Sequence, residues 1–155
     1  FCDLYRVGGC LNAAGKGVLG PLKDAKLTDL PLGSLFGGNT VEQGVLTRYV
    51  ASSGLAVPAV WAMCLEKFRA GTWTPDITSL VGPLSVDVVV CRPCAQRIFS
   101  ALLFHFRREI PRDALPAAVA ARPDCWHGPA CRTQFHNVDH AQRYNHACAA
   151  VRRKE

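Results

Sequence analysis

The chain has 155 residues, enough for one ordinary domain or two small ones, and its 49% apolar and 19% charged residues predict that most of it folds. It contains neither a signal-peptide pattern at its start nor an apolar run approaching the roughly 18 residues of a membrane helix, so we expect no membrane association. Because it begins at Phe1 rather than Met, we expect a fragment or processed product of a longer protein.

The net charge of +6 is unevenly distributed along the chain. Residues 1–90 contain seven Lys/Arg and seven Asp/Glu, whereas residues 91–155 contain eleven Lys/Arg and five Asp/Glu. All of the excess positive charge therefore lies in the C-terminal part. An electropositive face attracts polyanions such as nucleic acid, poly(ADP-ribose) or anionic lipid, and scattered solvated arginines are the alternative.

The first predicted helix follows a long irregular segment. Residues 1–38 are rich in Gly, Pro and Leu, which predicts irregular structure that packs against the body of the protein. A helix begins after Asn39, because Thr40 followed by Gln43 is a capping-box pattern. It ends at the Ser-Ser-Gly sequence of residues 52–54.

A second helix follows after a few residues. Pro58 suits its first turn, an apolar stripe runs from Trp61 to Phe68, and Gly71 ends it. Two helices so close in sequence predict an antiparallel helical hairpin.

The second half of the chain predicts more helix and little β-structure. Residues 86–90 indicate a short strand, residues 93–106 a helix that Pro111 stops, and residues 114–121 a short apolar turn. A last helix is expected from about Val138 to Val151, and it would carry both His140 and His146. The predicted fold class is therefore mainly α.

Eight cysteines indicate either disulfides or zinc sites. A secreted protein would pair them as disulfides, whereas an intracellular one would use them as metal ligands. The histidines near the C-terminal cysteines, the Cys91-Arg-Pro-Cys94 knuckle and the missing secretory signal favour zinc.

One group of ligands lies near the C-terminus. Five residues separate Cys125 from Cys131, eight separate Cys131 from His140, and five separate His140 from His146. Two thiolates and two imidazoles at loop-like spacing suit tetrahedral zinc. A DNA-reading finger has two to four residues between its cysteines and about twelve before its first histidine, so this spacing does not support groove reading. Metal binding would supply most of the folding energy of so short a finger.

The alternative is a purely structural zinc ion that holds the end of the chain in place without forming a ligand-binding face.

A second zinc site is expected upstream. The Cys91-x-x-Cys94 knuckle needs two further ligands, and Cys2 and Cys10 are the other paired cysteines. The loop that this site closes is long, but the cost of closure grows only logarithmically with length. Residues upstream of Phe1 that complete different sites for Cys2 and Cys10 are the alternative.

No catalytic constellation accompanies these sites. Cys64 lies in the apolar stripe of the second helix with no base nearby in the pattern, so we expect a core thiol. We find no Ser-His-Asp set, no Walker-type phosphate loop and no paired acids. The chain is therefore expected to bind and not to catalyse.

The sequence from Arg122 to Gln134, followed by His-Ala-x-x-x-Asn-His-x-Cys over residues 140–148, resembles the poly(ADP-ribose)-binding (PBZ-type) zinc finger. The form it resembles most is that of the CHFR-type checkpoint ubiquitin ligases, which carry forkhead-associated and RING domains. The resemblance extends upstream through Cys2-x7-Cys10, the Leu46-Thr-Arg-Tyr segment, the Cys91-x-x-Cys94 knuckle and the pattern that begins at Ile110.

The resemblance and the cysteine pattern together predict two zinc ions and two parts. A cysteine-rich helical body over residues 1–121 would hold a four-cysteine zinc site made by Cys2, Cys10, Cys91 and Cys94. A PBZ-type C2H2 finger over residues 122–155 would bind zinc through Cys125, Cys131, His140 and His146. The fold expected from it is a small zinc-stabilised, mainly α domain with a helical-hairpin body.

The resemblance also implies a ligand and the residues that bind it. An aromatic side chain would stack on adenine, and basic and polar groups would contact phosphate and ribose. The candidate residues are Arg122, Trp126, His127, Arg132 and Gln134. The general motif has Phe or Tyr where this chain has His127, and the gap of eight residues after Cys131 is longer than usual.

Each candidate has a simpler interpretation. Trp126 could pack inside the finger, and Arg122 and Arg132 could be solvated charges. We expect His136 to be a loop residue rather than a ligand, and Cys148 to be a buried thiol, with ligand exchange with His146 as the alternative.

The function implied is a poly(ADP-ribose)-binding module that recruits a ubiquitin ligase to poly(ADP-ribosyl)ated targets in mitotic checkpoint or DNA-damage signalling, in the nucleus. The ligase activity, and contact with a ubiquitin-conjugating enzyme, would belong to an upstream RING domain. A structural zinc-bound protein-interaction module and a general nucleic-acid binder are the alternatives.

Overall fold

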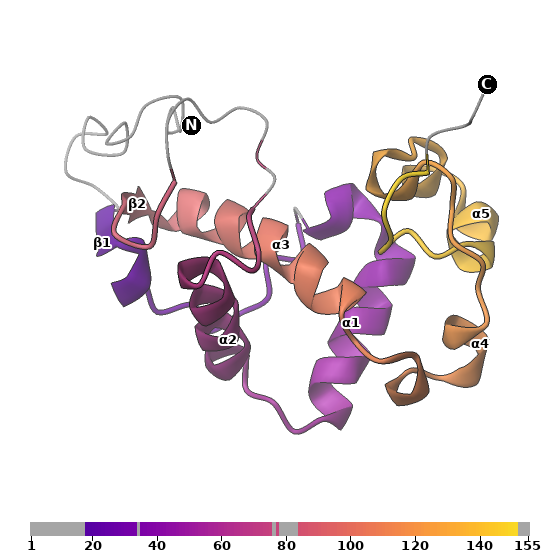
Figure 1. Cartoon of the computed structure of the whole chain (residues 1–155), viewed down its shortest axis with the longest axis horizontal. Coiled ribbons are helices and arrows are strands. Elements are labelled where there is room, and N and C mark those ends of the chain that lie inside the picture. Colours follow the sequence, from indigo (N-terminus) through magenta and orange to yellow (C-terminus); the bar gives the residue numbers. More distant parts are fainter. Residues whose placement is uncertain (1–17, 34, 76, 78–83, 152–155) are drawn as a thin grey trace. The chain divides into compact units, whose positions relative to one another are not determined.

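The computed structural model describes residues 18–33, 35–75, 77 and 84–151 (Figure 1). The elements of this part, in chain order, are β1 (Val18–Pro21), η2 (Leu22–Asp24), η3 (Leu35–Gly38), α1 (Thr40–Ser52), α2 (Val57–Arg69), β2 (Val89–Cys91), α3 (Arg92–Arg108), η4 (Arg112–Ala114), α4 (Ala117–Ala120), η5 (Gly128–Ala130), η6 (Thr133–Phe135) and α5 (Val138–Arg143). Helices thus dominate and strands are few, as the sequence predicted.

The chain divides into two compact units. The first takes the described parts of Phe1–Pro31 and Ala56–Leu102, and the second those of Leu32–Leu55 and Leu103–Glu155. The predicted boundary after residue 121 stays a prediction. What the structure adds is that the predicted finger shares a compact unit with α1.

The first unit is built around a short antiparallel ribbon and the indole of Trp61. β1 pairs with β2 in the register Val18 opposite Cys91, Gly20 opposite Val90 and Pro21 opposite Val89. The Trp61 ring on α2 packs against Phe99 with centroids 4.9 Å apart. Its Nε1 donates to the backbone carbonyl of Ala25 at 2.8 Å, so the polar end of a buried side chain is satisfied.

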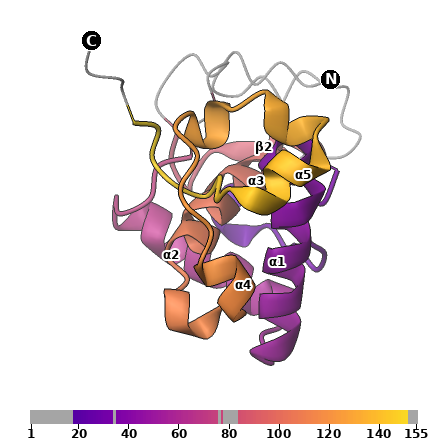
Figure 2. The same cartoon turned by 90° about the vertical axis from the view of Figure 1, so that its right-hand side faces the viewer.

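The second unit packs α1 against η3 and α5 (Figure 2). Asn39 caps α1, because its side-chain oxygen accepts from the backbone N–H of Glu42 at 3.1 Å. The Tyr49 ring lies 6.1 Å from that of Phe106 in the last turns of α3. The capping box predicted from Thr40 and Gln43 does not form. Instead, Gln43 donates through Nε2 to the carbonyls of Leu32 and Leu35.

Three further expectations are corrected. α1 and α2 both form, but they belong to different compact units and do not make one hairpin body. The segment expected to be irregular up to residue 38 contains strand β1, which gives the predicted strand its partner. The last helix ends at Arg143 rather than Val151. His140 is therefore helical, whereas His146 lies in the segment after the helix.

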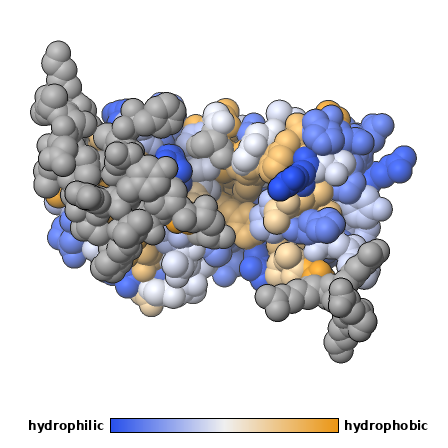
Figure 3. Space-filling view, turned by 90° about the horizontal axis from the view of Figure 1, so that it is seen from above, coloured by the Kyte–Doolittle hydropathy of each residue, from blue (hydrophilic) through white to orange (hydrophobic). Residues whose placement is uncertain are grey.

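Within the described residues, no single helix is long and apolar enough to cross a membrane, and α1 and α2 reach such a composition only when counted together across the break between them. The face in Figure 3 carries patches of hydrophobic residues among hydrophilic ones, and apolar atoms make up a large share of most protein surfaces.

Candidate metal centre

The predicted finger is a loop closed at its base by Asn145. The backbone N–H of Cys125 donates to the carbonyl of Asn145 at 2.8 Å, and the N–H of Asn145 donates to the carbonyl of Pro123 at 2.8 Å. The Asn145 side chain adds a bond from Nδ2 to Asp124 Oδ1 at 2.8 Å. The two ends of the finger are thus tied together, so the ligands at either end are held near one another.

Short elements between these ends position each ligand. Cys131 directly follows η5. His140 lies in the first turn of α5, where its backbone N–H donates a hydrogen bond to the side-chain oxygen of Asn137 at 3.0 Å. α5 stops at Arg143, and the chain then returns toward the cysteine loop. This early stop replaces the long helix that the sequence predicted, because the pairing of Asn145 with the base of the finger requires extended backbone there.

Gly128 is required by the fold of the cysteine loop. Its φ is +50°, in the left-handed region that favours glycine. A Cβ at this position would lie 2.8 Å from the backbone oxygen of Cys148. The returning segment therefore packs directly on the cysteine loop, and a larger residue would push the two apart.

The four predicted finger ligands lie together. The ligand atoms of Cys125, Cys131, His140 and His146 are all within 4.8 Å of one another. The Nε2 atom of His140 lies 3.8 Å from Cys125 Sγ and 3.4 Å from Cys131 Sγ. A zinc tetrahedron with metal–ligand bonds of about 2.0–2.3 Å has edges of about 3.6 Å, so these separations suit it.

His146 provides a second, independent indication of a metal. Its side chain is 2% exposed, yet neither ring nitrogen has a hydrogen-bond partner within the described residues. Burial, and then the neighbouring His140, lower the pKa of His146 and favour the neutral imidazole that binds metals. A bound metal would satisfy one of the two nitrogens, whereas without it a buried polar group would remain unpaired.

The cysteine side of the site is consistent with the same chemistry. Cys125 is buried, and this burial raises the pKa of its thiol. A thiolate there would need a compensating positive charge, which zinc supplies. The donor set and its spacing therefore fit zinc.

Two of the predicted ligand-binding residues lie beside the candidate metal ligands. A cavity of about 610 Å³ is lined by Cys125, Trp126, His127, His140, Tyr144 and Val151. Trp126 is 56% exposed, so it does not pack inside the finger. Tyr144 was not singled out from the sequence. The sequence could have indicated Tyr144, because it lies four residues after His140 and residues at this spacing on a helix are neighbours. In the structure the centroids of the two rings are 4.9 Å apart.

The other predicted ligand-binding residues lie elsewhere. Arg122 lines a different cavity from the one beside Trp126. Arg132 is exposed and lines neither of these two cavities. Gln134 is 5% exposed, its Nε2 donates to the carbonyls of Pro129 and Cys131, and its oxygen accepts from Asn39 at 2.9 Å. It therefore holds the finger against α1 and offers no polar group to a ligand in this arrangement. The off-motif His136 is exposed and outside the ligand group, as expected.

Two of the remaining cysteines, Cys64 and Cys148, were expected to be buried thiols, and the structure confirms their burial. Cys64 is fully buried, and burial raises the pKa of its thiol to about 12, as for a core thiol. Cys148 is also buried, and burial raises its pKa to about 11. Cys91 ends β2 and Cys94 lies in the first turn of α3, both buried. Their predicted partners Cys2 and Cys10 lie outside the described residues.

Comparison with known proteins adds a family and three relatives. Residues 1–110 match the family model described as a cysteine-rich domain with multizinc binding regions. The proteins named E3 ubiquitin-protein ligase CHFR from Homo sapiens, Pongo abelii and Mus musculus are 34%, 33% and 33% identical to this chain over 154 residues, which is 99% of its length. The chain spans only 22%, 26% and 22% of these relatives. Together with the Cys/His cluster, the family match confirms the prediction that the cofactor is zinc.

Proposed function

Since the chain belongs to the family of cysteine-rich domains with multizinc binding regions, we propose that it is the poly(ADP-ribose)-binding module of a CHFR-like E3 ubiquitin ligase. Cys125, Cys131, His140 and His146 hold one zinc ion. Cys91 and Cys94 share a second one with Cys2 and Cys10. The module brings the ligase to poly(ADP-ribosyl)ated proteins in the nucleus, and ubiquitin transfer belongs to other parts of the longer protein.

The observation that carries this proposal is the exposed aromatic face beside the zinc ligands. Trp126, His127 and Tyr144 surround a cavity large enough for a nucleoside. Stacking on an aromatic side chain suits adenine, the base that recurs in each ADP-ribose unit. The rigid metal site on one side would hold the stacking residues in place without a large apolar core.

Charge supports the same ligand. Residues 91–155 carry all of the net positive charge of +6, and ADP-ribose chains carry two negative phosphates per unit. Arg122 lies three residues before Cys125 in the sequence. The C-terminal part of the chain therefore combines an aromatic cavity for the base with an excess of positive charge that would attract the pyrophosphate.

Binding of labelled poly(ADP-ribose) to the chain tests this proposal. Trp126→Ala should weaken binding by roughly 5- to 150-fold, which corresponds to about 1–3 kcal/mol per stacked base. Phe135→Ala is the matched control, because Phe135 is an aromatic residue of the finger with 44% exposure and lies outside this cavity. Both variants should retain the zinc content of the unmodified chain.

Competition identifies the class of ligand. Unlabelled poly(ADP-ribose) should displace the labelled polymer far better than RNA, DNA or monomeric ADP-ribose. Equal displacement by RNA would instead support a general nucleic-acid binder. Absence of polymer binding by a fully zinc-loaded chain would support a structural interaction module.

A further inference from the structure

Two buried polar groups of the second unit lack the hydrogen bonds that burial requires. One is the ring of His146, whose two nitrogens have no partner in the described part of the chain. The other is the Oε1 atom of Glu42 on α1, in a residue that is only 1% exposed. A buried polar atom without a partner is costly, so both groups call for an explanation.

A zinc ion accounts for only half of the His146 ring. A neutral imidazole binds a metal through one nitrogen, and the other nitrogen then carries a proton that a carboxylate, a carbonyl or a water accepts. Because His146 is only 2% exposed, bulk solvent is a poor acceptor for this proton. A group of the protein is therefore needed to accept it.

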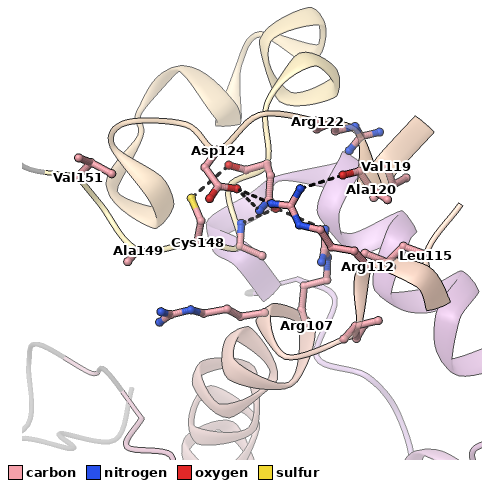
Figure 4. A pocket seen from close by; sticks show the side chains of 14 residues that line it. Arg107, Arg112, Leu115, Val119, Ala120, Arg122, Asp124, Cys148, Ala149 and Val151 are labelled. Atoms are coloured by element: carbon pink, nitrogen blue, oxygen red, sulfur yellow. Dashed lines mark hydrogen bonds and ion pairs between the residues drawn. The ribbon is translucent and has the colours of Figure 1, made fainter. Parts of the chain in front are cut away.

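Glu42 is fixed near His146 by hydrogen bonds at its backbone and at its side chain. Its backbone N–H donates to the side-chain oxygen of Asn39 at 3.1 Å, and its Oε2 accepts from Nε of Arg107 at 2.8 Å. The Nη2 atom of the same Arg107 lies 3.5 Å from the side-chain oxygen of Asn145, the residue before His146 (Figure 4). A single guanidinium therefore bridges the carboxylate and the segment that carries His146.

The ion pair with Arg107 does not by itself explain a carboxylate at this place. A buried ion pair often contributes no more stability than apolar side chains of similar volume would. The pair also uses only one of the two carboxylate oxygens, whereas an ionised carboxylate accepts hydrogen bonds at both. The Oε1 atom of Glu42 is thus a buried acceptor beside a ring that needs one.

Charge favours the same pairing. Among the described residues, Glu42 is the acidic side chain whose charge acts on the His146 ring, whereas His140 and Arg122, which also act on it, are basic. A carboxylate behind a metal-binding imidazole makes the ring a stronger ligand. The backbone carbonyl of Tyr144 is the competing acceptor, but its influence on the ring is weaker than that of Glu42, and the geometry of a hydrogen bond is not met.

We propose that Glu42 is a positioning residue of the finger's metal centre, and that its Oε1 accepts the hydrogen bond from the His146 ring nitrogen that does not bind zinc. Such a bond fixes the orientation and the tautomer of the ring and strengthens metal binding. The inference rests on the zinc ion of the proposed function and not on the identity of the ligand. It makes α1, which lies far from the finger in the sequence, a part of the metal centre.

Replacing both members of the ion pair separates this role from a purely structural one. Glu42→Leu combined with Arg107→Met removes both buried charges and keeps apolar volume, so the stability of the fold should change little. The double variant leaves the His146 ring without its acceptor, so the affinity of the finger for metal should fall about 10- to 100-fold. An unchanged affinity would overturn the proposal.

Titration with cobalt(II) in place of zinc measures this affinity. Its visible absorption depends on the ligand set, so the finger can be followed separately from metal held by Cys91 and Cys94 in the first unit. Metal bound there is the internal reference and should be unaffected. Leu46→Ala is the matched control, because Leu46 is fully buried one turn after Glu42 and its truncation destabilises α1 but keeps the carboxylate. Its own loss of affinity shows how much destabilisation alone contributes.

The ring proton of His146 provides a measurement on the unmodified chain. In NMR spectra of the zinc-saturated chain, this proton should exchange slowly with water and show a nuclear Overhauser contact to the side-chain protons of Glu42. Its resonance should move upfield in the double variant, because a hydrogen bond to a charged acceptor is the stronger one, while the ring proton of His140 should not move. A contact to Tyr144 alone, a proton that exchanges too fast to be observed, or an unchanged resonance would overturn the proposal.

The outcomes distinguish this inference from the proposed function. If the finger of the unmodified chain takes up no metal, its proposed zinc site fails and the role of Glu42 fails with it. If metal binds equally well to the unmodified chain and the double variant, only the role of Glu42 is wrong. If the finger binds metal as proposed but the chain does not bind poly(ADP-ribose), the proposed ligand is wrong and the role of Glu42 stands.

Discussion

Arg107 and Glu42 form a buried ion pair, with Arg107 Nε donating to Glu42 Oε2 at 2.8 Å and side chains only 5% and 1% exposed. Arg107 also reaches Asn145, with its Nη2 atom 3.5 Å from the side-chain oxygen. The same Asn145 closes the base of the finger. One guanidinium thus connects α1 to the segment that holds His146.

Removing one partner of this pair should destabilise the second unit strongly. Arg107→Gln leaves Glu42 buried without its countercharge, which costs about 3–5 kcal/mol. Denaturant unfolding would measure the loss. Asp87→Asn is the matched control, since Lys23 and Asp87 are as close, at 2.7 Å, but are exposed to solvent that screens their interaction. A similar loss in both variants would show that burial of the Arg107 pair does not matter.

Gln134→Ala should lower stability and leave affinity for the ligand unchanged. The substitution removes the bond from Asn39 and strands the carbonyls of Pro129 and Cys131, at a cost of about 1–3 kcal/mol. Thermal unfolding and poly(ADP-ribose) titration of the folded variant would separate the two effects. Weaker binding with unchanged stability would restore the ligand-binding role that the sequence suggested for Gln134.

Gly128→Ala should weaken the finger more than Gly54→Ala weakens α1. Both glycines have positive φ, so alanine at either position adds strain of about 1–2 kcal/mol. At Gly128 the new Cβ also meets the Cys148 oxygen at 2.8 Å, whereas at Gly54 nothing lies within 4 Å. Zinc affinity, measured by competition with a chelator, should fall only for Gly128→Ala. A loss of zinc affinity in both variants would point to backbone strain alone.

His146→Ala should remove one zinc ion per chain, and His136→Ala should remove none. The first histidine is buried among the other three candidate ligands, while the second is exposed and outside the group. Metal analysis of the purified variants gives the stoichiometry. Retention of full zinc by His146→Ala would mean that another side chain completes the site.

The helices and the finger ligands could be read from the sequence because both depend on local patterns. Apolar periodicity and a Pro in the first turn found α2, and ligand spacing found the four residues around the metal site. The early end of α5 could not be predicted in this way. It depends on Asn145 pairing with Asp124 and Cys125, which are about twenty residues away in the chain.

The roles of single side chains were harder to predict for the same reason. Gln134 is a polar residue of the kind that contacts ligands, so the sequence suggested that role. Its hydrogen-bond partner Asn39 lies 95 residues earlier, so their contact could not be seen in the local sequence. Strand β1 was missed because a four-residue strand rich in Gly and Pro has little pattern of its own and forms only against β2. Arg122 and Arg108 could not be assigned to one cavity before the segments that carry them were placed together.

The segment from Ala147 to Val151, which follows His146, contributes contacts to the finger. A chain cut immediately after His146 would keep all four candidate ligands, and by motif it would count as complete. It would lose the backbone that covers Gly128, the hydrogen bond from Val151 to Trp126, and a wall shared by both cavities. A finger that keeps these contacts therefore extends at least to Val151, five residues beyond His146, its last candidate ligand.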